Sequence, residues 1–167
     1  MAFQLDHKGT SLKSSAVIVK VLCDGLSSPA NVGSLFRICD AFGVNEIIFC
    51  NAVINFSSNR LLRTARDTQK KISYRVSENV LEEIEILKKE NFKILALEIT
   101  TNSIALDKIN FNNENKIALV IGNEQNGISE AVLAQIPTTL HIDMFGKNSS
   151  MNVTHAAAIA LYSLTKI

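Results

Sequence analysis

Short apolar runs that recur between longer amphipathic segments are the feature of this sequence that most constrains its fold. The runs are rich in β-branched residues and only five to seven residues long, which is typical of strands buried on both faces. They lie at residues 16–22, 46–50, 93–99, 116–121 and 139–143. Strands that alternate with helices predict a parallel sheet joined by right-handed crossovers. We therefore expect an α/β fold with a parallel sheet flanked by helices.

Helical periodicity and capping residues mark the segments between these runs. Asn31 is a natural N-cap for a helix that Gly43 ends, and residues 59–71 form a polar, basic helix candidate. Residues 100–115 carry five asparagines and are predicted to form a loop with one short turn. Further helices are predicted over residues 78–91, from residue 129 onward and over residues 152–165.

The length of 167 residues suits one domain with a single core, and no composition break or internal repeat divides the chain. Residues 1–15 lack apolar periodicity and are predicted to be a flexible N-terminal arm, which one domain follows over residues 16–167. A hydrophobic content of 47% excludes global disorder. No apolar stretch approaches the ~18–20 residues that span a bilayer, and the first fifteen residues show no secretory signal, so no membrane association is expected.

Three cysteines indicate the compartment. Cys23, Cys39 and Cys50 are odd in number, lie in apolar contexts and form no C-x-x-C pair. We interpret them as buried thiols of a reduced, intracellular and therefore cytoplasmic protein. A net charge of +1 neither demands nor forbids a nucleic-acid partner, so that question depends on local patterning.

The common nucleotide, metal and hydrolase motifs are absent from the sequence. The segment 122–127 (GNEQNG) follows a predicted strand, but Ile128 stands where a P-loop needs lysine. The loop after the first strand offers only Gly25, so the dinucleotide fingerprint is missing. The histidines are not clustered with cysteines or carboxylates at ligand spacings, so no metal site is expected, and no G-x-S-x-G elbow is present.

Three strand-to-helix loops are rich in small polar residues. They are residues 29–37 (PANVGSLFR), 121–128 (IGNEQNGI) and 142–153 (IDMFGKNSSMNV). In a parallel sheet such loops open at the carboxyl ends of the strands, where ligands bind. From about residue 16 to the C-terminus, these three loops in this order resemble the motifs of the SpoU, or TrmH-like, branch of the SPOUT RNA methyltransferases.

The resemblance implies a fold, an activity and partners. Members of that family transfer a methyl group from S-adenosylmethionine to a ribose 2′-hydroxyl of tRNA or rRNA. Their chains form a deep C-terminal trefoil knot, an exception to the rule that connections do not thread loops. They act as homodimers with the active site near the subunit interface. The resemblance thus implies a ribose 2′-O-methyltransferase that acts on tRNA, or otherwise on rRNA.

The family's catalytic positions match residues in each of the three loops. Asp143 departs from the family, where a proline usually precedes the methionine, and Met151 replaces the leucine of the Ser-Leu-Asn element. The resemblance assigns catalytic positions to Asn31, Arg37, Glu124, Ser150 and Asn152. It places the cofactor against Leu97, Gly122, Ile142, Met144 and Met151.

Each polar candidate also has an ordinary structural interpretation. Arg37 could be a surface residue whose stem covers its neighbours, or its guanidinium could grip a phosphate and stabilise the developing alkoxide. A guanidinium stays protonated at neutral pH, so Arg37 is a poor general base. Asn31 could cap its helix, act in the site, or both. Glu124 could be a solvated carboxylate, cap the next helix or orient Arg37. Ser150 could cap the last helix or bind the incoming ribose or phosphate.

A basic segment is the candidate RNA contact. On a continuous helix, spacings of three and four place Arg60, Arg63, Arg66 and Lys70 along one face. Such a face could simply be solvated, or it could give salt-sensitive RNA binding. Phe56 and Tyr74 flank it and could stack on a base, although core packing is the commoner role.

Two functions from other classes remain open. The chain could be a non-catalytic RNA-binding or assembly factor that keeps the fold, although the catalytic positions are intact. It could also be an ordinary nucleotide-binding domain, which predicts an unknotted chain and affinity for a phosphorylated ligand.

Overall fold

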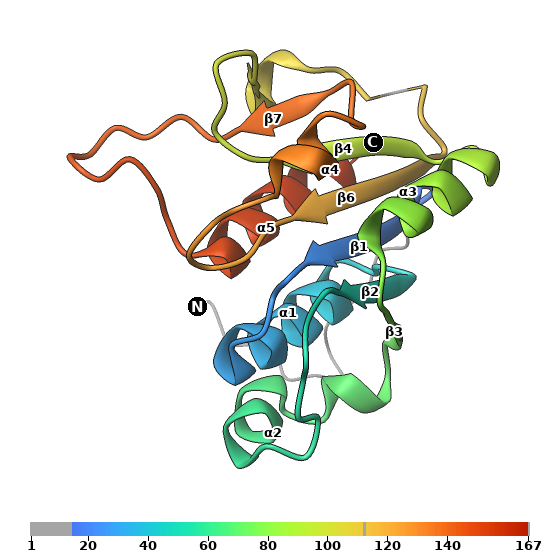
Figure 1. Cartoon of the computed structure of the whole chain (residues 1–167), viewed down its shortest axis with the longest axis vertical. Helices are drawn as coiled ribbons and strands as arrows, with labels where there is room; N and C mark the ends of the chain where they lie inside the picture. Colours follow the sequence, from blue (N-terminus) through green and yellow to red (C-terminus); the bar gives the residue numbers. More distant parts are fainter. Residues whose placement is uncertain (1–14, 112, 167) are drawn as a thin grey trace, which may run out of the picture.

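The computed structural model describes residues 15–111 and 113–166 (Figure 1). The predicted arm therefore lies outside the described residues except for Ser15. The strands are β1 (Ile18–Asp24), β2 (Glu46–Cys50), β3 (Ser73–Ser77), β4 (Lys93–Leu97), β5 (Ile104–Ala105), β6 (Lys116–Ile121) and β7 (Thr139–His141). The helices are α1 (Pro29–Ala41), α2 (Asn59–Ala65), α3 (Val80–Lys89), α4 (Glu130–Leu133) and α5 (Val153–Leu164), with 3-10 turns η1 (Thr68–Lys70) and η2 (Leu106–Lys108).

One parallel sheet organises the molecule. Its strand order is β3-β2-β1-β6-β4-β7-β5, and each of its strand pairings is parallel. The expected α/β fold with a helix-flanked parallel sheet is therefore confirmed. Because all strands run the same way, the loops after β1, β4, β6 and β7 leave the sheet at one edge.

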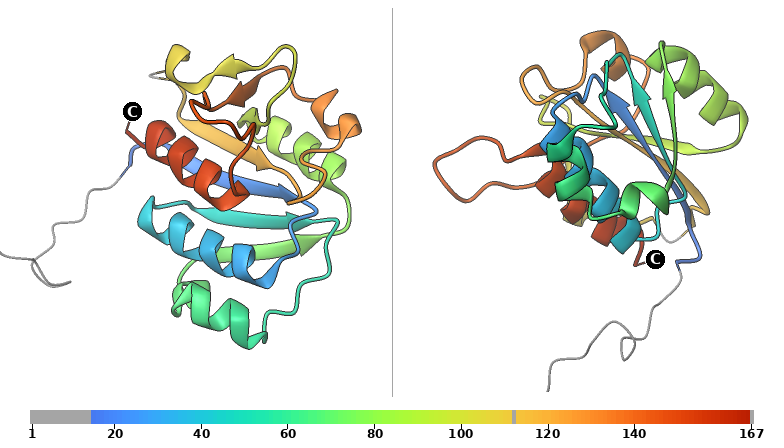
Figure 2. Two further views of the ribbon diagram at one scale, coloured as in Figure 1. Left: turned by 90° about the vertical axis from the view of Figure 1, so that its left-hand side faces the viewer. Right: turned by 90° about the horizontal axis from the view of Figure 1, so that it is seen from below.

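Helices cover both faces of the sheet, which explains the continuous apolar runs. In β1, Val19, Val21 and Cys23 belong to a core shared with α1 and α5, whereas Leu22 belongs to a second core with α3 and α4. Figure 2 shows α1, α2 and α5 together on one face. Side chains alternate across a strand, so burial on both faces requires apolar residues at consecutive positions.

A close approach of backbones holds α2 against α1. A Cβ added to Gly33 would lie 2.5 Å from the Leu61 carbonyl oxygen and 2.9 Å from the Thr64 Cβ. Glycine at this position lets the two helices touch. The contact anchors α1, the helix that carries the first polar motif.

The basic helix predicted over residues 59–71 is shorter in the structure, so its basic residues are arranged differently than expected. Arg66 (φ 49°) and Asp67 (φ 67°) both adopt the left-handed conformation, so α2 ends at Ala65 and η1 follows. Arg60, Arg63, Arg66 and Lys70 are exposed, but they do not lie on one continuous helical face.

The structure also settles how three neighbouring side chains of this region are used. Arg75 lies in β3, an edge strand that was not predicted, and pairs with Glu83 and Glu46. Tyr74 lies 4.9 Å from Phe56 between ring centroids, and both rings pack in a cluster with Phe36 and Phe49. These two aromatic rings therefore pack against protein.

Candidate functional site

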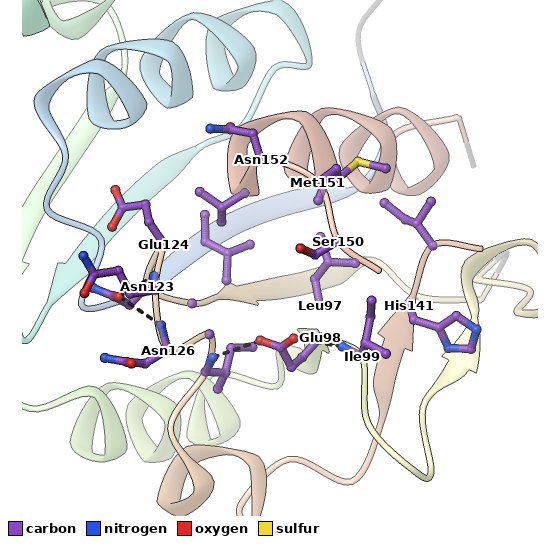
Figure 3. A pocket seen from close by; sticks show the side chains of 18 of the residues that line it. Leu97, Glu98, Ile99, Asn123, Glu124, Asn126, His141, Ser150, Met151 and Asn152 are labelled. Carbon is purple, nitrogen blue, oxygen red and sulfur yellow. Dashed lines mark hydrogen bonds between the residues drawn. The ribbon is translucent and has the colours of Figure 1, made fainter. Parts of the chain in front are cut away.

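A pocket of about 560 Å³ opens where β4, β6 and β7 end (Figure 3). It brings together residues from all three polar loops, which lie far apart along the chain. Every residue predicted to contact a cofactor lines it, namely Leu97, Gly122, Ile142, Met144 and Met151. Four of the five predicted catalytic residues line it as well, namely Asn31, Glu124, Ser150 and Asn152.

A chain of hydrogen bonds joins one residue from each loop. The Asn152 amide donates to the Asn31 Oδ1 at 3.1 Å, and the Asn31 amide donates to the Glu124 Oε1 at 3.1 Å. The same carboxylate oxygen accepts from the Ser28 backbone N–H at 3.0 Å. The three motifs therefore form one connected polar wall.

The expected cap role of Asn31 is wrong. The N-cap of α1 is Ser28, and Pro29 begins the helix, where a missing N–H costs nothing. Asn31 lies in the first turn of α1 with its amide committed to Asn152 and Glu124. Its side chain is free for this role because the chain enters the helix earlier than predicted.

Asn152 combines a structural role with a place in the site. It is the N-cap of α5, and its Oδ1 accepts from the Thr154 backbone N–H at 2.9 Å and from the Thr154 hydroxyl at 2.6 Å. Its amide nitrogen remains available for Asn31. Ser150 is exposed in the pocket lining, and the cap role considered for it is taken by Asn152.

Glu124 is oriented differently from the expectations. It contacts the start of α1 rather than the next helix, whose N-cap is Ser129. It does not orient Arg37 within its own chain. Arg37 is exposed on α1, lies outside the pocket lining and forms no hydrogen bond or ion pair with the described residues.

The loop after β6 is closed by backbone contacts that require glycine. Asn123 and Gly127 exchange two backbone hydrogen bonds at 2.9 and 3.0 Å. A Cβ on Gly122 would lie 2.1 Å from the Gly127 carbonyl carbon. Gly122 is therefore needed for the tight turn that presents backbone groups to the pocket.

Two carboxylates at the strand ends were missed by sequence reasoning. Asp24 is buried and accepts from the Asn51 amide at 2.9 Å and from the Ser129 N–H and hydroxyl at 3.0 and 2.8 Å. Glu98 lines the pocket and accepts from the backbone N–H groups of Ile99 and Ile128 at 2.9 and 3.0 Å. An acidic residue directly at the end of a buried strand is the signal that could have found both.

His141 stands at the edge of the pocket. Its Nδ1 lies 3.0 Å from the Ser103 Oγ, and its Nε2 lies 3.2 Å from the Asp143 Oδ1. Asp143, where the resembled family usually has proline, thus gives the start of this loop a polar contact with β7.

The cysteines are chemically quiet, as expected of buried thiols. All three are free and buried. Burial raises the pKa of the Cys50 thiol to about 12, and burial also raises the pKa of Cys23 and Cys39 well above the ordinary value. A thiol with a raised pKa carries little of the reactive thiolate, so none is a candidate nucleophile.

The described part of the chain contains neither a membrane-spanning helix nor a group of side chains that could hold a metal ion. No helix there is long and apolar enough to cross a bilayer. Over residues 15–111 and 113–166, no three histidine, cysteine or acidic side chains are grouped as a metal would require.

Comparisons with known proteins agree with the fold and motifs. The model of the SpoU rRNA Methylase family matches residues 18–162. The 23S rRNA (guanosine(2553)-2'-O)-methyltransferase RlmP of Bacillus subtilis is 28% identical over 144 residues, 86% of this chain and 56% of the relative. The tRNA (guanosine(18)-2'-O)-methyltransferase of Saccharomyces cerevisiae is 27% identical over 165 residues, 96% of this chain and 11% of that much longer protein.

Solved structures share the architecture. An AdoMet-bound rRNA methyltransferase from Sinorhizobium meliloti superposes with a TM-score of 0.80 at 20% identity, covering 89% of this chain and 56% of that one. The A. aeolicus TrmH/SpoU tRNA modifying enzyme superposes with a TM-score of 0.77 at 24% identity, covering 89% and 74%. At these identities the likeness establishes the fold.

Proposed function

Because this chain belongs to the SpoU rRNA methylase family, we propose that it methylates a ribose 2′-hydroxyl of RNA, with tRNA as the substrate. S-adenosylmethionine is the methyl donor and supplies, when bound, an electrophilic methyl group on a positively charged sulfur. The observation that carries the proposal is the hydrogen-bonded chain from Asn152 through Asn31 to Glu124 on the wall of one pocket.

The pocket fits this donor in size and chemistry. Its volume of about 560 Å³ lies within the ~300–1,000 Å³ of small-molecule sites. Leu97, Ile142 and Met151 offer apolar surface for an uncharged ring, and the turn at Gly122 offers backbone hydrogen-bonding groups. These residues would hold the donor.

The polar residues of the site position the RNA. Ser150 and Asn152 are exposed on the same loop end and can hydrogen-bond a ribose or phosphate. Positioning of a hydroxyl for in-line displacement contributes up to about 7–11 kcal/mol to lowering a barrier, and it needs no covalent enzyme intermediate. Because the reaction needs positioning and no covalent enzyme intermediate, hydrogen-bonding side chains are sufficient for the described site.

The placement of Arg37 supports a homodimer. Its guanidinium lies outside the pocket of its own chain, yet it is exposed and without a partner among the described residues. A second copy would let it approach the neighbouring pocket, where it grips an RNA phosphate and stabilises developing negative charge. Ile159 and Tyr162 are 42% and 51% exposed on α5 and offer apolar surface for such an interface.

We also propose that the chain after β7 forms the trefoil knot of the family and that the protein is cytoplasmic. The free, buried cysteines support a reducing compartment. For RNA binding, Arg60, Arg63, Arg66 and Lys70 are exposed and supply positive charge around α2 and η1. Contacts of this kind to phosphates weaken as salt is raised.

Mass spectrometry of nucleosides tests the function and identifies the substrate. Unmodified tRNA and rRNA are each incubated with the protein and S-adenosylmethionine, then digested and analysed for 2′-O-methylated nucleosides. A methylated nucleoside from tRNA is the expected result, and methylation of rRNA alone would change the substrate. RNA binding without methylation under any condition would instead identify a non-catalytic factor.

A further inference from the structure

The charged side chains that line the pocket are all acidic. Glu98 and Glu124 contribute carboxylates, while no lysine or arginine lines the pocket in the part of the chain that the structure describes. Figure 3 shows Glu98 between Asn126 and Ile99, on the side of the view away from Met151 and Asn152. The two acidic residues come from different strands' ends, β4 and β6, so the pocket faces carboxylates from two elements.

Glu98 is held in a fixed position at this wall. One carboxylate oxygen accepts from the Ile99 N–H at 2.9 Å and the other from the Ile128 N–H at 3.0 Å. The Gly127 backbone packs so closely that a Cβ there would lie 2.2 Å from the Glu98 Oε2. Two backbone donors and this close backbone packing fix the orientation of the Glu98 carboxylate.

Glu124 differs from Glu98 in its surroundings. It is exposed, and its Oε1 is shared between Ser28 and Asn31 at the start of α1. Glu98 is partly buried at the end of β4, next to the apolar residue Leu97. A carboxylate in this less solvated position acts on a nearby charge with less screening.

The proposed reaction removes a positive charge from this pocket. A bond forms between the ribose oxygen and the methyl carbon, the bond from that carbon to sulfur breaks, and the hydroxyl proton leaves with the positive charge. The donor enters as a sulfonium cation and the product remains as an uncharged thioether. A fixed negative charge therefore interacts differently with the two ligands.

We propose that Glu98 is a specificity-determining residue that favours the cationic methyl donor over its neutral thioether product. The proposal rests on the proposed function, because it assigns the pocket to S-adenosylmethionine. In a medium of intermediate dielectric constant, a fixed carboxylate about 6–8 Å from a sulfonium changes the affinity for that cation by about five- to tenfold. Glu98 thus aids exchange of product for fresh donor after each turnover.

Calorimetric titration tests this without measuring activity. S-adenosylmethionine, S-adenosylhomocysteine and sinefungin, which carries an amine in place of the methylsulfonium, are titrated into the wild-type chain and into Glu98→Gln, Glu98→Asp and Glu130→Gln. Glu98→Gln removes the charge, whereas Glu98→Asp keeps it but shortens the reach. Glu130 is an exposed acidic residue of α4 outside the pocket lining and serves as the matched charge control.

The ratio of affinities decides the outcome. We expect Glu98→Gln to weaken S-adenosylmethionine and sinefungin about five- to tenfold while changing S-adenosylhomocysteine less than about twofold. Glu98→Asp and Glu130→Gln should keep the wild-type ratio. Equal weakening of all three ligands by Glu98→Gln, or no change, would overturn the proposal and leave the proposed function intact. Failure of the wild-type chain to bind any of the three would instead overturn the proposed function.

Discussion

At the scale of single residues, the site depends on an amide at its centre. Asn31 accepts from Asn152 through its oxygen and donates to Glu124 through its nitrogen. A carboxylate in its place has no donor and would bring a second negative charge beside Glu124. This position therefore uses both a donor and an acceptor, which helix capping alone does not require.

Asn31→Asp separates the role of this amide from stability. The variant keeps the shape of the side chain and places an acid in the first turn of α1, where the helix dipole favours it. We expect the rate of methylation to fall at least about tenfold, since one bond is lost and a repulsion is added. The free energy of unfolding in urea should change by less than about 0.5 kcal/mol.

Asn152→Asp tests the same network from its other end. It keeps the oxygen that caps α5 through Thr154, but it loses the N–H that donates to Asn31. It should slow methylation while leaving stability unchanged, whereas Asn152→Ala should also lower stability by about 1 kcal/mol. Full activity of Asn31→Asp in single-turnover assays would contradict the proposed network.

At the scale of elements, burial decided what could be predicted from the sequence. The interior strands β2 and β6 match their predicted ranges because their apolar runs have clear ends. The edge strand β3 (SYRVS) was missed, since half-exposed residues alternate there with polar ones and resemble a loop. The two-residue strand β5 is too short to leave a pattern.

Local backbone conformation explains the error in the basic helix. Non-glycine residues seldom adopt positive φ, yet Arg66 and Asp67 do so consecutively. Arginine is a good helix former, so Arg66 gives no signal in the sequence that the helix ends there. Asp67 then forms an ion pair with Lys70 at 2.7 Å, and that hydrogen bond lowers the Asp67 pKa.

The residues that line the pocket were predicted well from the sequence, whereas their hydrogen-bond partners were not. Loop motifs at the carboxyl ends of parallel strands are bound to meet at one edge, so Asn31, Glu124 and Asn152 were expected together. Their hydrogen-bond partners depend on where each helix begins, which the sequence indicates only within a few residues. This is why the cap of α1 moved from Asn31 to Ser28.

The break after α2 leads to a prediction about RNA binding. Arg60 and Arg63 lie in the intact helix, and no ion pair occupies them among the described residues, whereas Lys70 is already paired. Arg60→Ala with Arg63→Ala should weaken RNA binding and reduce its salt slope by about one to two, while Lys70→Ala has a smaller effect. Fluorescence anisotropy over a range of salt concentrations measures both quantities.

Lys88→Ala with Lys89→Ala is the control, since it removes the same charge from α3 on the opposite side of the sheet. A salt slope reduced equally by both double variants would show that only net charge matters and that α2 forms no dedicated contact.

The ion pair that ties β3 to α3 makes stability depend on pH. Hydrogen bonds from Arg75 lower the pKa of Glu83 below its ordinary value of 4.5. Because the folded-state pKa of Glu83 is lowered, its ionised carboxylate stabilises the fold fully above about pH 4.5. This stabilisation is lost as the pH falls through the lower pKa of the folded state. Glu83→Gln should therefore cost about 1–2 kcal/mol at pH 7, and the difference should shrink toward pH 3.

Urea unfolding at pH 7, 5, 4 and 3 measures this difference. Glu85→Gln is the control on the same helix, because Glu85 is exposed and pairs only with Lys88 among the described residues. A constant difference between the wild type and Glu83→Gln across this pH range would contradict the role of the pair.

At the scale of the whole molecule, the described chain forms a pocket but leaves one catalytic candidate apart from it. Asn31, Glu124 and Asn152 meet on the pocket wall, while Arg37 lies outside it on the exposed side of the same α1 helix. Arg37 is six positions after Asn31, which places the two side chains on different faces of the helix. In the proposed homodimer, the neighbouring subunit would bring such an arginine to this pocket wall.

Mixed dimers test this arrangement, because each proposed site would take its pocket from one subunit and its arginine from the other. Arg37→Ala and Glu124→Gln chains are each expected to be inactive alone. In a mixed dimer, the intact pocket of the Arg37→Ala chain faces the intact Arg37 of the Glu124→Gln chain, so one site works.

Co-expression with two distinguishable tags should restore about a quarter of wild-type methylation in the total dimer pool. Half of the dimers are mixed, and each mixed dimer has one working site of two. If Arg37 acts within its own chain, every pocket lacks one group and the mixture stays inactive. Methylation measured on the doubly tagged dimers decides between these outcomes, and sedimentation of the same sample shows that dimers have formed.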